Sequence, residues 1–154
     1  MPKKRLVFVD ETGFDEFFYR KHARAFKGEK VMAEISGKRF ERQSIVGAKR
    51  DKDILAPFGY SGTCDTILFN FWLETQLVPN LRKGQVVILD NAAIHKSEET
   101  KMIIKKAKCH LVFLPPYSPD LNPIEHIWAH KKQNIRSNMH KFSSLSNAVN
   151  HAFS

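Results

Sequence analysis

Residues 110–138 read HLVFLPPYSPDLNPIEHIWAHKKQNIRSN, and this stretch decides the class of fold. His110 to Leu114 has the short apolar pattern of a buried strand. Four of the chain's seven prolines follow within the nine residues 115–123, and they make a stiff, non-helical connection. From Pro123 to Asn138 the apolar residues recur at helical spacing, with proline at the first helical position. The stretch therefore predicts a strand, a rigid return loop and a helix.

Shorter apolar runs upstream predict the other strands of a sheet. Arg5–Asp10 and Gln85–Leu89 have the length of buried strands, and acidic or amide residues end each run. Lys38–Lys49 alternates in the manner of a half-buried strand, and Asp53–Phe58 suits its antiparallel partner. We expect Thr12-Gly13 to close the first strand.

Helix start signals separate these strands. Asp65 and Ser97 are N-cap residues directly before helical patterns, and Ser144 marks a short helix at the end of the sequence. The pattern after Asp65 ends near Pro79. Its apolar stripe comprises Ile67, Leu68, Phe71, Trp72 and Leu77 or Val78. Further core positions are expected at Phe69, Ile124, Ile127, Trp128 and Ile135.

The element order predicts an α/β fold. Three strands come first and suit antiparallel pairing, and the last two suit parallel pairing through helical crossovers. The expected architecture is a mixed five-stranded sheet flanked by helices.

The composition excludes several classes of protein. The chain has 154 residues, 42% of them hydrophobic, which suits a single globular domain over 1–154. No apolar run approaches the roughly 18 residues of a membrane span, and the run after Arg5 is too short for a signal peptide. Cys64 and Cys109 form no CxxC pair, which favours reduced, packed thiols in a cytoplasmic protein.

The charge indicates an anionic partner. Lys and Arg number 25 against 16 Asp and Glu, a net charge of +9, which favours nucleic acid first and a membrane surface second. The candidate phosphate contacts are Arg20, Lys21 and Arg24 in a loop and Lys131, Lys132 and Arg136 in the last long helix. A solvated helix face explains the second run equally well. His126 and His130 have zinc-ligand spacing, but no third ligand is near in sequence, so we expect them at the surface or facing DNA.

Three acids stand at the ends of predicted elements. Asp10 ends the first strand, Asp90 ends the fourth, and Glu125 lies in the first turn of the helix after the prolines. Ligand sites of open α/β sheets lie at the carboxyl ends of strands, so we expect these acids to meet. Grouped carboxylates repel unless a cation is bound, and one or two Mg²⁺ or Mn²⁺ ions would resolve the repulsion. Two such ions in a basic chain indicate phosphodiester chemistry on nucleic acid.

Structural explanations of the same acids remain open. A strand-terminal Asp is often a turn former, and Asn122 with Glu125 matches a capping box that needs no chemistry. Glu11 competes with Asp10, but alternation along a strand predicts that only one of the two faces the site.

Three segments together resemble a known family. They are FVDETGF at 8–14, VILDNAAIH at 87–95 and LPPYSPDLNPIE at 114–125. They resemble the three catalytic blocks of DDE transposases of the Tc/mariner superfamily, most of all its bacterial insertion sequence 630 group. The 34 residues between Asp90 and Glu125 agree with the superfamily's spacing.

The resemblance implies an RNase H-like fold and a metal-binding triad. By analogy Asp10 bridges two Mg²⁺ or Mn²⁺ ions, while Asp90 and Glu125 each hold one. Asn91 and His95, like Asn122, match near-site positions that support the ligands or contact DNA.

The reaction implied is hydrolysis at transposon ends, which releases a 3′-OH that attacks target DNA. An RNase H-like nuclease or resolvase without strand transfer, and a catalytically silent DNA-binding remnant, remain as alternatives. The resemblance leaves open whether the chain acts as a homodimer on DNA. Members of the family also carry an N-terminal helix-turn-helix region, which we expect to be absent from these residues.

Overall fold

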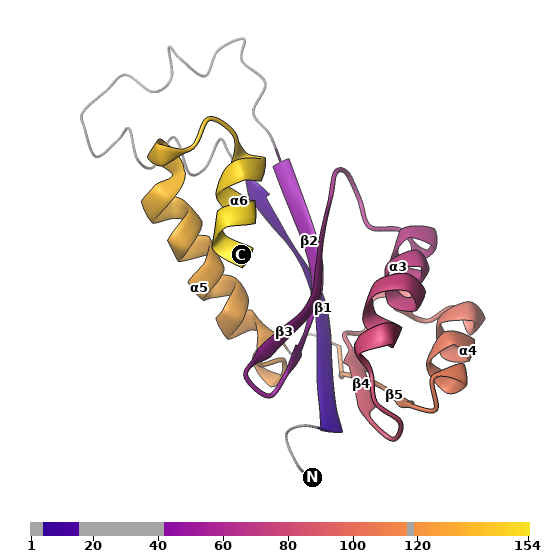
Figure 1. The fold of residues 1–154 in the computed structure, drawn as a ribbon. Helices are drawn as coiled ribbons and strands as arrows, with labels where there is room; N and C mark the ends of the chain where they lie inside the picture. The colour runs from indigo at the N-terminus through magenta and orange to yellow at the C-terminus, as the bar shows by residue number, and fades with distance from the viewer. Residues whose placement is uncertain (1–4, 16–41, 117–118) are drawn as a thin grey trace. The chain divides into compact units, whose positions relative to one another are not determined.

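A computed structural model describes residues 5–15, 42–116 and 119–154, and its centre is a mixed five-stranded sheet (Figure 1). The strands are β1 (Leu6–Asp15), β2 (Arg42–Arg50), β3 (Asp53–Tyr60), β4 (Val86–Leu89) and β5 (His110–Phe113). Their order in the sheet is β3-β2-β1-β4-β5. β1 pairs with β4, and β4 with β5, in parallel. A two-residue turn joins β2 to β3, so these neighbours are antiparallel, and the predicted fold class is confirmed.

Four α-helices of the described residues accompany the sheet. They are α3 (Thr66–Trp72), α4 (Glu98–Lys106), α5 (Ile124–Asn138) and α6 (Leu145–Phe153). The three predicted N-caps are confirmed, because side-chain oxygens of Asp65, Ser97 and Ser144 accept hydrogen bonds from backbone N–H groups of the first helical turn, at 2.8, 3.1 and 3.2 Å. None of the helices in the described ranges is long and apolar enough to cross a membrane.

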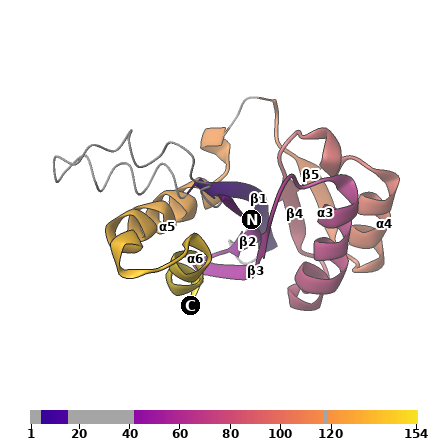
Figure 2. The ribbon, with the colours of Figure 1, turned by 90° about the horizontal axis from the view of Figure 1, so that it is seen from above.

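The chain divides into two compact units. Unit 1 comprises residues 1–11, 45–59 and 63–125, and unit 2 comprises 12–44, 60–62 and 126–154. In unit 1, α3 and α4 accompany the parallel strands β4 and β5 (Figure 2). The buried indole of Trp72 donates a hydrogen bond to the carbonyl of Ala56 at 2.8 Å, which fixes α3 to β3. Cys109 is buried in this unit, and Cys64 and Cys109 are not joined in a disulfide.

Aromatic packing holds unit 2 together. The ring of Phe153 on α6 meets Phe14 of β1 edge to face at 6.1 Å, and it lies 6.1 Å from Trp128 of α5. Ser146 donates a hydrogen bond to the side chain of Gln43 on β2 at 3.1 Å. The predicted core of α5 is confirmed at Trp128 and Ile135, which are both buried.

Two predictions about elements are wrong. β1 does not end at Thr12-Gly13 but continues to Asp15. The described glycines with positive φ are Gly62 and Gly84, so Gly13 has ordinary extended backbone and turns nothing.

The apolar stripe of α3 is also displaced from its predicted position. Ile67 is 81% exposed and Phe71 is 52% exposed, whereas the buried apolar face consists of Phe69, Trp72, Leu73 and Leu77. A π-helical turn at Leu73–Leu77 follows α3, and a 3₁₀ turn at Val78–Asn80 follows that. Because the helical period changes there, a stripe extended backwards from Leu77 at 3.6 residues per turn loses its phase.

Candidate active site

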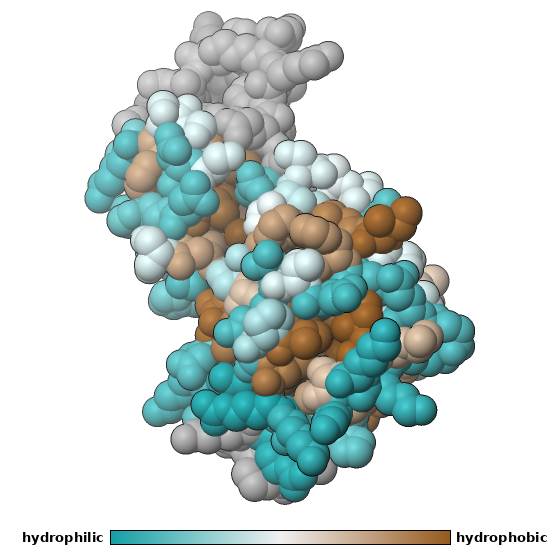
Figure 3. Space-filling view, turned by 45° about the vertical axis from the view of Figure 1, so that its right-hand side comes forward, coloured by the Kyte–Doolittle hydropathy of each residue, from teal (hydrophilic) through white to brown (hydrophobic). Residues whose placement is uncertain are grey.

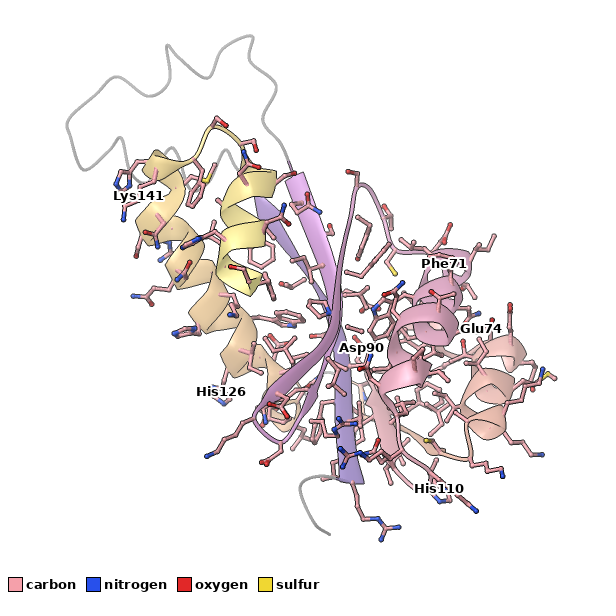
Figure 4. The ribbon with its side chains drawn as sticks, in the orientation of Figure 1. Phe71, Glu74, Asp90, His110, His126 and Lys141 are labelled. Atoms are coloured by element: carbon pink, nitrogen blue, oxygen red, sulfur yellow. The ribbon has the colours of Figure 1, made fainter. Side chains whose placement is uncertain are left out.

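Two predicted acids lie level with each other at the carboxyl end of the parallel strands. The register pairs Phe8 with Ile88, so the same offset sets Asp10 beside Asp90. Asp10 is buried, and its carboxylate belongs to a group of three, with Glu11 and Asp90, whose oxygens lie within 4.8 Å of one another. Figure 4 labels Asp90 at the end of β4. The parallel pairing therefore brings together acids that are 80 residues apart in the chain.

Glu11 belongs to this group, and the prediction that only one of Asp10 and Glu11 can face the site is wrong. The register between β1 and β4 ends with Phe8 and Ile88, so both acids extend past the last paired residues. Among the described residues no strand pairs with β1 on the β4 side beyond this point, so the longer Glu side chain can join the same group of carboxylates. Strand alternation alone could not find this residue.

A buried histidine joins two of the carboxylates. His95 ends the 3₁₀ turn Ala93–His95 after β4, and it has no exposed surface. Its Nε2 lies 2.8 Å from Oε1 of Glu11, and its Nδ1 lies 2.7 Å from Oδ1 of Asp90. The ring packs on Phe69 with 4.4 Å between centroids. His95 therefore reaches the site from inside the protein, which leaves it no surface for a DNA contact.

Asp10, Asp90 and His95 have shifted pKa values. Burial, together with a hydrogen bond to Glu125, raises the pKa of Asp10 to about 8. Contact with His95 lowers the pKa of Asp90. Burial alone would lower the pKa of His95, but the bonds to Asp90 and Glu11 outweigh it and raise that pKa to about 10. The site thus holds one positively charged imidazolium among several carboxylates, and its net charge remains negative.

Glu125 approaches this group from the start of α5. Its side chain is exposed, lies outside the tight group of three and hydrogen-bonds with Asp10. Asn122 sets this position, because its buried side-chain oxygen accepts the N–H of Ile124 at 3.2 Å and its carbonyl accepts the N–H of Glu125 at 3.1 Å. Asn122 therefore caps α5, and the cap aims the first turn of the helix at the carboxylates.

A known protein family matches the part of the chain that carries these residues. A family model described as "DDE superfamily endonuclease" matches residues 5–147 of the chain. The chain belongs to the DDE superfamily endonucleases. It is 31% identical over 114 residues to the transposable element Tc1 transposase of Caenorhabditis elegans. The aligned region covers 71% of this chain and 40% of that protein. It is 38% identical over 64 residues to an insertion element IS630 39 kDa protein of Shigella sonnei, covering 41% of this chain and 18% of that protein.

The solved structure of the Mos1 mariner transposase catalytic domain has the same fold. The TM-score is 0.55 at 13% identity, over 83% of this chain and 58% of that one. The RNase H-like fold and the resemblance to Tc/mariner and insertion sequence 630 transposases are therefore confirmed. The chain spans less than half the length of the Tc1 transposase and of the IS630 protein.

The remaining predicted site residues of this DDE endonuclease chain are spread more widely. Asn91 is half-buried and follows Asp90 directly. Arg20, Lys21 and Arg24 lie outside the described residues. Lys131 donates a hydrogen bond to the carbonyl of Ala152 at 2.6 Å and lies over the ring of Phe153. Lys132 lies 6.0 Å from the centroid of the Phe14 ring, and Arg136, like His126 and His130, is exposed.

These contacts give Lys131 and Lys132 a structural use in unit 2. The ammonium group of Lys131 donates a hydrogen bond to a carbonyl at the C-terminal end of α6, where the helix dipole favours a cation. Lys131 and Lys132 therefore contribute packing as well as positive charge.

Proposed function

We propose that this chain is the catalytic domain of a metal-dependent DNA transposase that cuts phosphodiester bonds at transposon ends and transfers the 3′-OH strand to target DNA. One observation carries the proposal. The carboxylates of Asp10, Glu11 and Asp90 converge at the carboxyl edge of the sheet, and Glu125 hydrogen-bonds to Asp10. Transposases among the relatives of the chain support the same reaction class.

The residues at this edge fit hard divalent cations. Carboxylate oxygens are the donors that Mg²⁺ and Mn²⁺ prefer, and the group carries more negative charge than His95 balances. We propose that Asp10, Asp90 and Glu125 hold two such ions. When bound, the ions would activate a water or a 3′-OH and stabilise the leaving oxygen of the phosphodiester.

The residues of the chain itself hold these acids in place. His95 fixes the carboxylate of Asp90 from within the protein, and Glu11 holds the other nitrogen of the imidazole. The Asn122 cap fixes the backbone that carries Glu125. Ligands held by packed neighbours need little reorganisation when the reaction begins.

Two substitutions test the active site. Asp90→Ala and Glu125→Ala are each expected to abolish cleavage of DNA in Mn²⁺, because each removes a proposed ligand, while binding of non-specific DNA persists through the basic residues. His126→Ala, at an exposed position on α5, is the matched control and should cleave normally. Unchanged cleavage by either acid variant would refute the assignment.

A joining assay separates the transposase from its rivals. Pre-cleaved ends are incubated with a plasmid in Mn²⁺, and a transposase joins the two. A nuclease or resolvase of the same fold would cut without joining, and a silent DNA-binding remnant would do neither. Sedimentation of the chain with and without the ends then tests the proposed homodimer on DNA.

A further inference from the structure

The opposite end of the parallel strands carries the opposite charge. Arg5 precedes β1, Arg82 and Lys83 precede β4, Lys108 precedes β5, and Lys105 lies in the last turn of α4. All five side chains are exposed. We call these five residues the basic edge. All of them belong to unit 1.

Hydrogen bonds tie the segments of the basic edge together. The N–H of Gly84 donates to the carbonyl of Lys108 at 2.9 Å, and the guanidinium of Arg5 donates to the carbonyl of Gly84 at 3.5 Å. The thiol of Cys109 lies 3.3 Å from the carbonyl of Arg82. Three segments far apart in sequence thus present their positive charges from one fixed scaffold.

Within residues 5–15, 42–116 and 119–154, no acid forms an ion pair with the basic edge. The ion pairs of the described residues join His95 to Glu11, His95 to Asp90 and Lys101 to Glu98, and none involves the basic edge. Asp51 and Asp53 flank the β2–β3 turn, where Arg50 and Lys52 are their neighbours in sequence. The part of the sheet formed by β1, β4 and β5 therefore has at its amino end five positive charges that no described acid pairs with.

A groove continues the basic edge along α4. It lies between α4 and β5, has a volume of about 300 Å³, and is lined by Lys105 and His110 together with Lys101, Ile104, Cys109, Leu111 and Phe113. His110 is labelled in Figure 4 at the start of β5, and Figure 3 shows hydrophilic side chains gathered at the lower end of that face. The groove is a concave surface beside exposed cationic side chains.

We propose that the basic edge binds the phosphate backbone of a double-stranded DNA segment other than the one at the carboxylates. Five charges spread over three segments match a row of phosphates better than a single small anion. The four residues of β4 put about 13 Å between the two ends of the sheet, and these ends face opposite ways. A duplex that lies across the carboxylate end leaves the opposite end of the sheet to a second segment or a second duplex.

The surface does not suit a membrane. Binding to a lipid surface usually adds apolar anchors to the basic residues. The exposed large apolar side chains of the described residues are Ile67, Phe71, Met102, Val112 and Leu121. Met102 lies on α4 and Val112 on β5, whereas the five residues of the basic edge are all charged, which favours phosphate contacts as its chemistry.

The test is the salt dependence of DNA binding by the double variant Lys83→Gln/Lys108→Gly. Lys108 has φ 60°, where glycine is favoured, so its replacement removes a charge without straining the backbone. The affinity of the whole chain for a labelled duplex is measured between 0.05 and 0.3 M salt (roughly the range over which counterion release is resolved) with EDTA present. Each lost phosphate contact lowers the salt slope by about 0.9, so the double variant should lose about 1.8 in slope and up to about 60-fold in affinity at 0.1 M.

The matched control is Lys96→Gln/Lys141→Gln, which removes the same charge at two exposed positions outside the basic edge and its groove. Lys96 already lies over the ring of Phe113. The control should keep the slope of the original chain. Equal losses in both variants, or none in the edge variant, would overturn the proposal. So would edge-dependent binding that is tighter for single-stranded RNA or for anionic lipid vesicles than for duplex DNA.

The proposed DNA contact at the basic edge goes beyond the proposed function, and the outcome of its test does not depend on cleavage. Binding in EDTA needs no divalent ion and no cleavage, so an inactive carboxylate site leaves the expected slopes unchanged. Conversely, the protein could cleave DNA while the edge variant keeps the salt slope of the original chain. That result would refute the proposed role of the basic edge and leave the active-site assignment standing.

Discussion

Replacing His95 by Gln tests the arrangement of the carboxylates directly. The imidazole has no exposed surface and contacts Glu11 and Asp90 at 2.8 and 2.7 Å. Gln is uncharged and reaches only one of the two acids, so the variant leaves buried negative charge without its partner. We expect a lower free energy of unfolding and a weaker hold on Asp90.

The magnitude follows from the exposure of the two partners. Removing one member of a buried ion pair costs about 3–5 kcal/mol. Here the Glu11 side chain is 16% exposed and the Asp90 side chain 41%, so water screens the contribution of Asp90. We expect a loss of about 2–3 kcal/mol, mainly from Glu11. For a chain of this length that loss lowers the melting temperature by roughly 4–12 °C.

Thermal unfolding with and without Mn²⁺ is the assay. Without the ion His95→Gln should melt below the original chain, while His126→Gln, an exposed control, should melt with it. Saturating Mn²⁺ should narrow the gap, because a cation stabilises the acid-rich variant more. A melting temperature unchanged by His95→Gln, or a gap that Mn²⁺ leaves untouched, would refute the reasoning.

Four further outcomes follow from the same contacts. Because the pKa of Asp10 is about 8, its proton competes with the ion, so Mn²⁺ affinity by calorimetry should rise about tenfold per pH unit up to pH 8 and then level off; a flat profile contradicts this. The raised pKa values of Asp10 and His95 stabilise the metal-free fold at low pH, so its melting temperature should fall as the pH rises from about 4 to about 10, and a rise would contradict the assignment. Glu11→Gln keeps an acceptor for the imidazole and should lose less cleavage activity than Glu11→Ala; equal losses would argue against the bond to His95. Asn122→Ala removes the cap of α5 and should cost about 1 kcal/mol of stability in denaturant melts, against no change for Asn150→Ala at an exposed position of α6.

Local signals predicted most elements of the fold. Asp65, Ser97 and Ser144 were identifiable as N-caps because a cap is a bond between neighbours in sequence. The proline-rich return and the helix from residue 124 were likewise encoded locally. The phase of the α3 stripe was not, since the π-helical turn at Leu73–Leu77 has no marker that a 3.6-residue period reveals.

The candidate site was only partly predictable for a different reason. Asp10 and Asp90 follow from where two strands end, once those strands are assumed to be parallel neighbours. The inclusion of Glu11 depends on where the pairing of β1 stops, which is a property of the partner strand. A helix-period or strand-period pattern carries no such information. The one sequence signal was the acid directly after Asp10, and alternation argued against it.

Parallel pairing also explains why the two charged ends of unit 1 should act independently. β1, β4 and β5 run the same way, so residues that precede the strands share one end and residues that follow them share the other. The ends lie about 13 Å apart, beyond the 7–10 Å or so at which substitutions usually couple. Combining His95→Gln with Lys83→Gln/Lys108→Gly should therefore give the melting temperature of the first variant and the salt slope of the second. Coupling between the two effects above about 0.5 kcal/mol would mean that the ends communicate through the sheet, and the basic edge would then belong to the catalytic site after all.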